Sequence, residues 1–222
     1  MGQENRNQEK IYQDFDNIIQ IENSGIIEGF EYVEIHRMIN NKHKFFKTFD
    51  FVPGTVFYDG QPFFNVDLKY NVFQDILLIQ IENDQGKMIF QPFDSRLDGF
   101  ILQNRTFENI KAVETGPELA GIYEVLLETD GIKVLKKHRK KEKTLLDREV
   151  VYYEFSADEP HYFYWVNNKL EILNRSNLME SFPEEKSNIR NFYRSKRKEA
   201  KNNPDVFIQN LFKMLYDKLK DE

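Results

Sequence analysis

Cysteine is absent from this chain of 222 residues, which excludes disulfide bonds and any chemistry that depends on a thiolate. Long apolar runs are missing as well. No stretch approaches the roughly 20 residues that a membrane-spanning helix needs, so we expect no transmembrane segment. The chain also lacks an excess of basic residues, since its formal net charge is -6. No overall positive field therefore attracts nucleic acid or an anionic membrane.

The motifs of several common enzyme classes do not occur either. The sequence contains no G-x-S-x-G, no G-x-G-x-x-G, no phosphate-binding G-x-x-x-x-G-K-[ST] and no H-E-x-x-H. We therefore expect no catalytic residues, no cofactor and no metal. A hydrolase that uses two carboxylates stays open as an alternative, because 37 acidic residues always offer a pair somewhere in the chain.

Aromatic residues are abundant, with 20 phenylalanines and 11 tyrosines, and this composition favours strands. The clearest pattern is a hairpin. Thr55 to Tyr58 and Pro62 to Tyr70 alternate apolar with polar residues, and Asp59-Gly60 between them is a tight-turn dipeptide. Ile76 to Ile81 is an aliphatic run that predicts a third, more deeply buried strand.

Turn signals continue at short intervals, which predicts an α+β fold built on an antiparallel β-meander of about ten or more strands. The sheet is expected to be curved or a partly closed barrel. Both ends of the chain have helical periodicity instead. We expect an N-terminal amphipathic helix within residues 1–25, the β domain over 26–175, and C-terminal helices over 176–222 that pack on it as one folding unit.

Two short patterns are candidates for sites. Glu34-x-His36 on a strand would place both side chains on one face, as two metal ligands would be, although a pair at the protein surface is the simpler interpretation.

The segment 40–50 interleaves basic and aromatic residues, as grooves for single-stranded nucleic acid do. A loop anchored by its phenylalanines explains this segment better, so we see no strong nucleic-acid signal.

Binding of a partner has two candidate regions. A basic run extends from Lys136 to Lys143 and could meet an anionic surface, or it could be a solvated hairpin end. An aromatic cluster spans two neighbouring predicted strands, where alternation sends about half of the rings outward. The candidate partner-binding residues are Lys136, Lys137, His138, Arg139, Lys140, Lys141, Tyr153, Tyr162, Tyr164 and Trp165.

Several long stretches carry a resemblance to known sequences. They include GTVFYDGQPFFNVDLKYNVFQDILLIQ, GIYEVLLETDGIKVLKKHRKK and LMESFPEEKSNIRNFY. From about Phe30 to its end, the chain resembles an uncharacterised group of exported proteins of Bacteroidota, especially flavobacteria. The resemblance implies a periplasmic or outer-membrane-associated location with the signal peptide removed, and it implies no activity. A cytoplasmic protein with a native start at Met1-Gly2 is the other interpretation.

These observations predict a non-enzymatic exported binding or accessory protein of the cell envelope. A subunit or plug of an outer-membrane protein complex would be one form of it. One alternative is a lipocalin-like carrier of a small ligand or lipid, which needs a dry apolar interior. The other is the carboxylate-dependent hydrolase.

Overall fold

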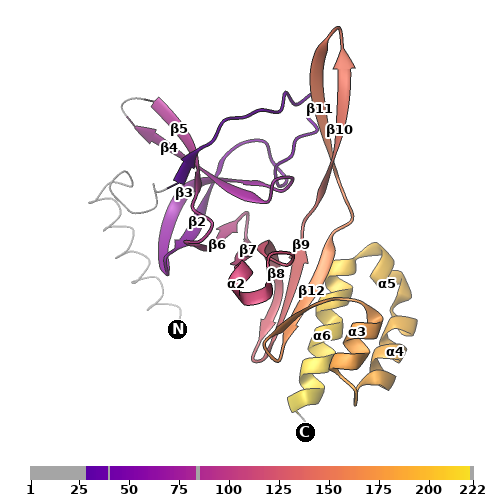
Figure 1. Cartoon of the computed structure of the whole chain (residues 1–222). Helices are drawn as coiled ribbons and strands as arrows, with labels where there is room; N and C mark the ends of the chain where they lie inside the picture. The colour runs from indigo at the N-terminus through magenta and orange to yellow at the C-terminus, as the bar shows by residue number, and fades with distance from the viewer. Residues whose placement is uncertain (1–28, 40, 84–85, 221–222) are drawn as a thin grey trace. The chain divides into compact units, whose positions relative to one another are not determined.

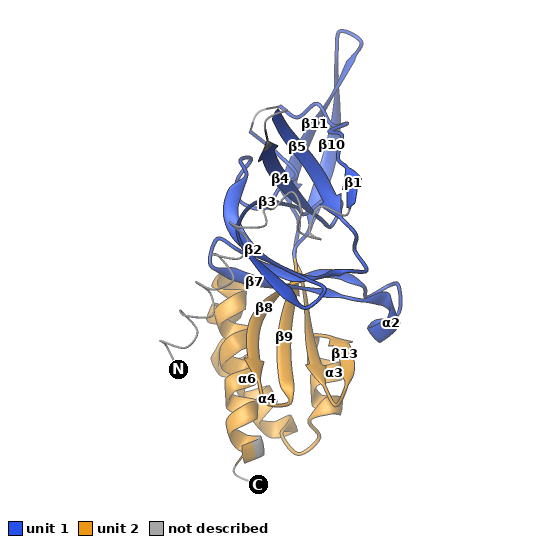
Figure 2. Cartoon of the chain, turned by 90° about the vertical axis from the view of Figure 1, so that its left-hand side faces the viewer, with its two compact units in different colours: residues 1–122, 138–159 blue, residues 123–137, 160–222 orange. Residues whose placement is uncertain are grey.

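The computed structural model describes residues 29–39, 41–83 and 86–220. These residues divide into two compact units, coloured in Figure 2. Unit 1 contains the described residues up to Ile122 together with His138–Glu159, and unit 2 contains Tyr123–Lys137 together with the described residues from Pro160 onward. The predicted helix within residues 1–25 lies outside the described residues.

The predicted α+β class with an antiparallel meander is confirmed, because each unit contains antiparallel strands that pair mostly with their neighbours in sequence, and helices follow the strands of unit 2 (Figure 1). The expected closure of the sheet into a partial barrel is not found, since the described end strands β1 and β7 of unit 1 do not pair with each other. In unit 1, the strands form a sheet in the order β1-β5-β4-β3-β2-β6-β7, and β10 and β11 form a separate two-stranded sheet. Their bounds are β1 Gly29–Glu31, β2 Val52–Tyr58, β3 Gln61–Asn71, β4 Ile76–Asn83, β5 Gly86–Pro92, β6 Leu97–Leu102, β7 Arg105–Ile110, β10 Lys140–Asp147 and β11 Val150–Ala157. A one-turn helix, α2 (Ala112–Thr115), follows β7.

The predicted hairpin is present as β2 and β3. Asp59 and Gly60 join the strands with φ values of 50° and 72°, which are the left-handed values that a tight two-residue hairpin loop requires. The core of unit 1 is filled with aromatic rings. Phe100 and Phe107 stack at 4.7 Å between ring centroids, and Phe107 meets Phe46 edge-on at 5.2 Å.

Unit 2 pairs its strands in the order β8-β9-β12-β13, and its helices follow β13 (Figure 2). Val134 lies opposite Tyr164 and Ile132 opposite Val166, so these four side chains share one face of the sheet. The bounds are β8 Gly121–Thr129, β9 Ile132–Lys137, β12 His161–Val166, β13 Lys169–Ile172, α3 Arg175–Ser181, α4 Lys186–Ser195, α5 Arg197–Asn202 and α6 Pro204–Lys220.

The helices of unit 2 pack on that face. Leu178 of α3, Ile189 of α4 and Leu211 of α6 are completely buried in one cluster with the β9 and β12 side chains. The helices therefore share a core with these strands, so the unit boundaries do not coincide with the predicted division at residue 175. Within the described residues, no helix combines the length and apolar character needed to cross a membrane.

Candidate functional site

Hairpin β10–β11 extends beyond the rest of unit 1 as a long two-stranded ribbon (Figures 1 and 2). Its register pairs Lys140 with Ala157 at the base and Asp147 with Val150 at the tip. Arg148 and Glu149 form the loop, and their φ values of 45° and 73° are left-handed. Hairpin loops of this geometry favour Asn-Gly, so Arg148 and Glu149 adopt it at a cost.

Within the described residues, nothing pairs with the outer edge of β10. Tyr153 donates its amide to the Arg37 carbonyl at 2.9 Å and accepts from the Ile39 amide at 3.2 Å, so its backbone groups point away from β10. Since Thr144 lies opposite Tyr153 in the register, the two form a non-hydrogen-bonded pair. The N–H and C=O of Thr144 therefore point outward from β10, and by alternation so do those of Glu142 and Leu146. Among the described strands, β10 pairs with β11 alone.

Most side chains of β10 are exposed as well, and the tip of the hairpin is apolar. Leu146 and Val151 lie opposite each other and are 74% and 42% exposed. Exposed apolar side chains beside unpaired backbone groups are features of surfaces that bind a further strand. The hairpin therefore offers both backbone hydrogen bonds and apolar contact area.

The base of the hairpin is held by the segment that precedes β2. The Phe155 amide donates to the Lys42 carbonyl at 2.9 Å, and the Lys42 ammonium is 2.8 Å from the Glu154 carboxylate. On the other face, the His36 ring meets Tyr153 and Phe155 edge-on, with centroids 4.9 and 5.4 Å apart. These contacts hold the base of the hairpin on the rest of unit 1.

We call the contacts between residues 34–44 and the base of the hairpin the anchor. The completely buried Lys44 lies within this segment. The Lys44 ammonium donates to Glu34 Oε1 at 2.8 Å and to Gln74 Oε1 at 3.0 Å, and it lies 2.9 Å from His36 Nδ1. Burial would raise the pKa of the Glu34 carboxyl, but hydrogen bonds from Lys44 and from the His36 amide outweigh it and lower that pKa. Burial, with the neighbouring Glu34 carboxylate, raises the pKa of the Tyr32 hydroxyl, which donates to Glu34 at 3.1 Å.

The interpretation of Glu34 and His36 as a surface pair on a strand was wrong in two respects. The residues from Tyr32 to Arg37 do not form a strand, and the His36 side chain is only 11% exposed. Both side chains contact Lys44, and His36 Nε2 is also 3.6 Å from Glu142 of β10. In the described parts of the chain, no three histidine, aspartate or glutamate side chains are grouped as a metal ion would need.

In unit 1, the predicted basic residues have intramolecular partners. Lys141 and Arg139 approach the Asp158 carboxylate to 2.7 and 3.5 Å. Lys140 donates its ammonium to the His43 carbonyl, and burial lowers the pKa of Lys140 to about 8. The His138 ring packs on Phe46, with centroids 4.9 Å apart. The remaining predicted residue of unit 1 is Tyr153, whose backbone bonds to Arg37 and Ile39 hold β11 in place.

In unit 2, Asp205 of α6 brings two of the predicted residues together. It accepts from the Lys136 ammonium at 2.7 Å and from the Tyr162 hydroxyl at 2.6 Å. The remaining predicted residues of this unit have separate partners. The Lys137 ammonium lies 4.5 Å from the Tyr123 ring centroid, the buried Tyr164 bonds Ser181 at 2.7 Å, and Trp165 pairs with Lys133 and Leu170 in the sheet.

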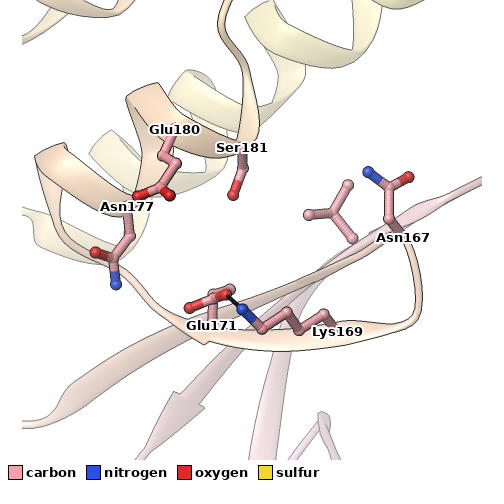
Figure 3. Close-up of a pocket in the computed structure, with 7 residues that line it drawn as sticks. Asn167, Lys169, Glu171, Asn177, Glu180 and Ser181 are labelled. Carbon is pink, nitrogen blue, oxygen red and sulfur yellow. Dashed lines mark ion pairs between the residues drawn. The ribbon is translucent and has the colours of Figure 1, made fainter.

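Unit 2 also contains a polar pocket of about 380 Å³, which sequence reasoning missed. Figure 3 shows Glu180 and Ser181 on α3 above Asn167 and Lys169, which belong to the β12–β13 turn and to β13. Lys169 pairs with Glu171. Burial raises the pKa of Tyr164, whose hydroxyl bonds Ser181 Oγ, so this phenol stays protonated at neutral pH. The pocket can hold a small polar molecule; its lining residues are Val166, Asn167, Lys169, Glu171, Asn177, Glu180 and Ser181.

No protein-family model matches the chain, and no curated protein or solved structure is significantly similar to it. The basis for a proposed function is therefore the geometry of the described residues, together with the resemblance of the sequence.

Proposed function

We propose that this protein is a non-enzymatic binding or accessory protein of the cell envelope, and that hairpin β10–β11 receives its partner. The open edge of β10 is the observation that carries this proposal. Its outward amides and carbonyls, at Glu142, Thr144 and Leu146, offer a partner strand a complete set of main-chain hydrogen bonds. The cell envelope as the compartment rests on the sequence resemblance.

The anchor beneath the hairpin supports this role. Strand addition loses less conformational entropy when the receiving edge is already ordered. Here the backbone bonds of Tyr153 and Phe155 and the buried Lys44 cluster hold the base of the hairpin on unit 1. Natural proteins often carry lysines on exposed strand edges, and the exposed Lys143 of β10 fits that pattern; a partner strand with an acidic residue opposite it would be favoured.

A proline at Thr144 tests the proposal. Its amide points outward and contributes no bond to β11, so Thr144→Pro removes one donor from the open edge while the hairpin keeps its own bonds. Thr144→Val, which keeps the amide, is the matched control. Both variants should retain the far-UV circular dichroism of the wild type and slow exchange of the Tyr153 amide.

The assay is affinity capture from solubilised cell envelopes under native conditions. We expect the wild type and Thr144→Val to retain a protein that folded Thr144→Pro loses. Equal retention by all three proteins would contradict a role for the β10 edge. Retention of no envelope protein by the wild type would contradict the accessory function itself.

The pocket of unit 2 favours a second candidate function, the carboxylate-dependent hydrolase. Glu171 and Glu180 line the same pocket, and two carboxylates in one pocket are the minimum that such chemistry requires. Glu171 is already paired with Lys169, so Glu180 would be the group to replace. If the pocket is catalytic, Glu180→Gln should abolish hydrolysis of any glycoside or ester substrate found in a screen. Unchanged turnover would reject the pocket as its site.

A further inference from the structure

Residues 141–149 can be aligned antiparallel with a second copy of the same residues, so that Leu145 lies opposite Leu145. In this alignment basic residues lie opposite acidic ones. Lys143 then meets Asp147, Glu142 meets Arg148, and Lys141 meets Glu149. The hairpin does not use this symmetry, because its own register places Lys143 opposite Glu154 and Asp147 opposite Val150. Neither Lys143 nor Asp147 forms an ion pair within the described residues. Among the described residues, Lys143 and Asp147 are therefore the two charges of β10 that remain available to a partner, whereas Lys141 and Glu142 also approach Asp158 and His36.

We propose that the strand received by the β10 edge is β10 of a second copy of this chain, paired antiparallel with a twofold axis at Leu145. This inference rests on the proposed function and names the partner of the same edge. The two hairpins would form one four-stranded sheet in the order β11-β10-β10-β11. Such a dimer satisfies the outward backbone groups of Thr144 and Leu146 in both copies. It is also closed, because the same surface is used on both copies.

The backbone geometry permits this register. Thr144 and Leu146 have outward-pointing amides and carbonyls, so Thr144 of one copy and Leu146 of the other form a hydrogen-bonded pair. The two Leu145 residues then meet as a non-hydrogen-bonded pair, the type in which side chains lie closest. Leu146, now 74% exposed, loses part of that exposure to the neighbouring strand.

The neighbouring registers match the charges less well. Moving the axis to Thr144 keeps Lys141 opposite Asp147, but it places Lys143 opposite Leu145 and Glu142 opposite Leu146. Moving the axis to Lys143 brings the two Lys143 ammonium groups together, which is unfavourable. Of these three axes, only the one at Leu145 places the strand residues Lys143 and Asp147 opposite each other, with Glu142 and Lys141 toward the loop residues of the other copy. Lys141 also contacts Asp158, so the two central Lys143–Asp147 pairs contribute most.

The absence of cysteine makes a direct test possible. Leu145→Cys should form a disulfide-linked dimer under mild oxidation, because cysteines opposite each other in a non-hydrogen-bonded pair can meet disulfide geometry. Leu146→Cys is the matched control. It is the more exposed position, so random collision would oxidise it faster, whereas the proposed register separates the two copies of residue 146. Faster cross-linking at 145 supports the proposal; faster cross-linking at 146, or none at 145, overturns it.

Charge reversal tests the same register without cross-linking. Asp147→Lys places two lysines opposite each other and should weaken dimerisation roughly tenfold in sedimentation equilibrium. Lys143→Asp combined with Asp147→Lys restores opposite charges and should recover the wild-type dissociation constant. A double variant as weak as the single one would contradict the register. If Leu145→Cys does not cross-link but capture of an envelope protein still depends on Thr144, the self-association fails and the proposed function stands.

Discussion

Replacement of Lys44 with methionine tests whether the buried cluster holds the hairpin in place. Methionine has a similar length and fills the volume, but it cannot donate to Glu34 or Gln74 or contact the His36 nitrogen. Glu34 is 35% exposed and can regain water, and Gln74 keeps a donor in Asn71 at 2.5 Å. The loss therefore falls mainly on the charge-assisted bond to Glu34 and on His36. We expect a cost of about 3 kcal/mol, at the upper end of the range for losing a hydrogen bond to a charged group.

The cost should appear as faster hydrogen exchange in the anchor. At about 1.4 kcal/mol per tenfold change, the Tyr153 and Phe155 amides should exchange roughly a hundredfold faster if opening follows the loss of Lys44. Lys87→Met is the control, because the Lys87–Glu82 pair is exposed and 3.6 Å long. Exposed ion pairs of this kind contribute about 0–1 kcal/mol to the free energy of unfolding. Exchange in Lys44→Met as slow as in Lys87→Met would refute the anchoring role of Lys44.

Three further outcomes follow from the same contacts. Arg148→Asn combined with Glu149→Gly should raise the melting temperature and slow exchange in the hairpin, because it relieves about 1 kcal/mol of left-handed strain; a lower melting temperature would contradict this. The lowered pKa of Glu34 means that its stabilisation is present above the unfolded value near 4.5 and is lost as pH falls through the folded value. Urea midpoints measured at decreasing pH should therefore drop less in Lys44→Met than in the wild type. Leu211→Ala should cost about 3 kcal/mol in urea unfolding followed by Trp165 fluorescence, whereas Lys213→Ala on the exposed side of α6 should cost almost nothing.

Much of the fold could be predicted because its turns carry strong local signals. Asp59-Gly60 and Asn167-Asn168 adopt the left-handed conformations that these residues tolerate, and the strands on either side alternate as expected. The helical periodicity after Ser176 is likewise reflected in the buried faces of α3, α4 and α6. In these segments the local preference and the tertiary structure agree.

The candidate site was harder to predict, because its features depend on contacts distant in sequence. The loop Arg148-Glu149 lacks any residue typical of tight turns, so the basic run gave no sign that β10 is a strand. The sequence does not distinguish Lys44 from the neighbouring Lys42 and Lys47. The burial of Lys44 depends on Gln74, thirty residues away, and on the turn before β4. No local pattern encodes an interaction of that kind.

Site-resolved hydrogen exchange on β10, in the free chain and in its captured complex, tests the proposed strand addition most directly. The inward amides of Lys143 and Leu145 already face β11 and should exchange slowly in both states. The outward amides of Glu142, Thr144 and Leu146 should exchange quickly in the free chain and slowly in the complex. Outward amides that remain fast in the complex would contradict the proposal that β10 receives a partner strand.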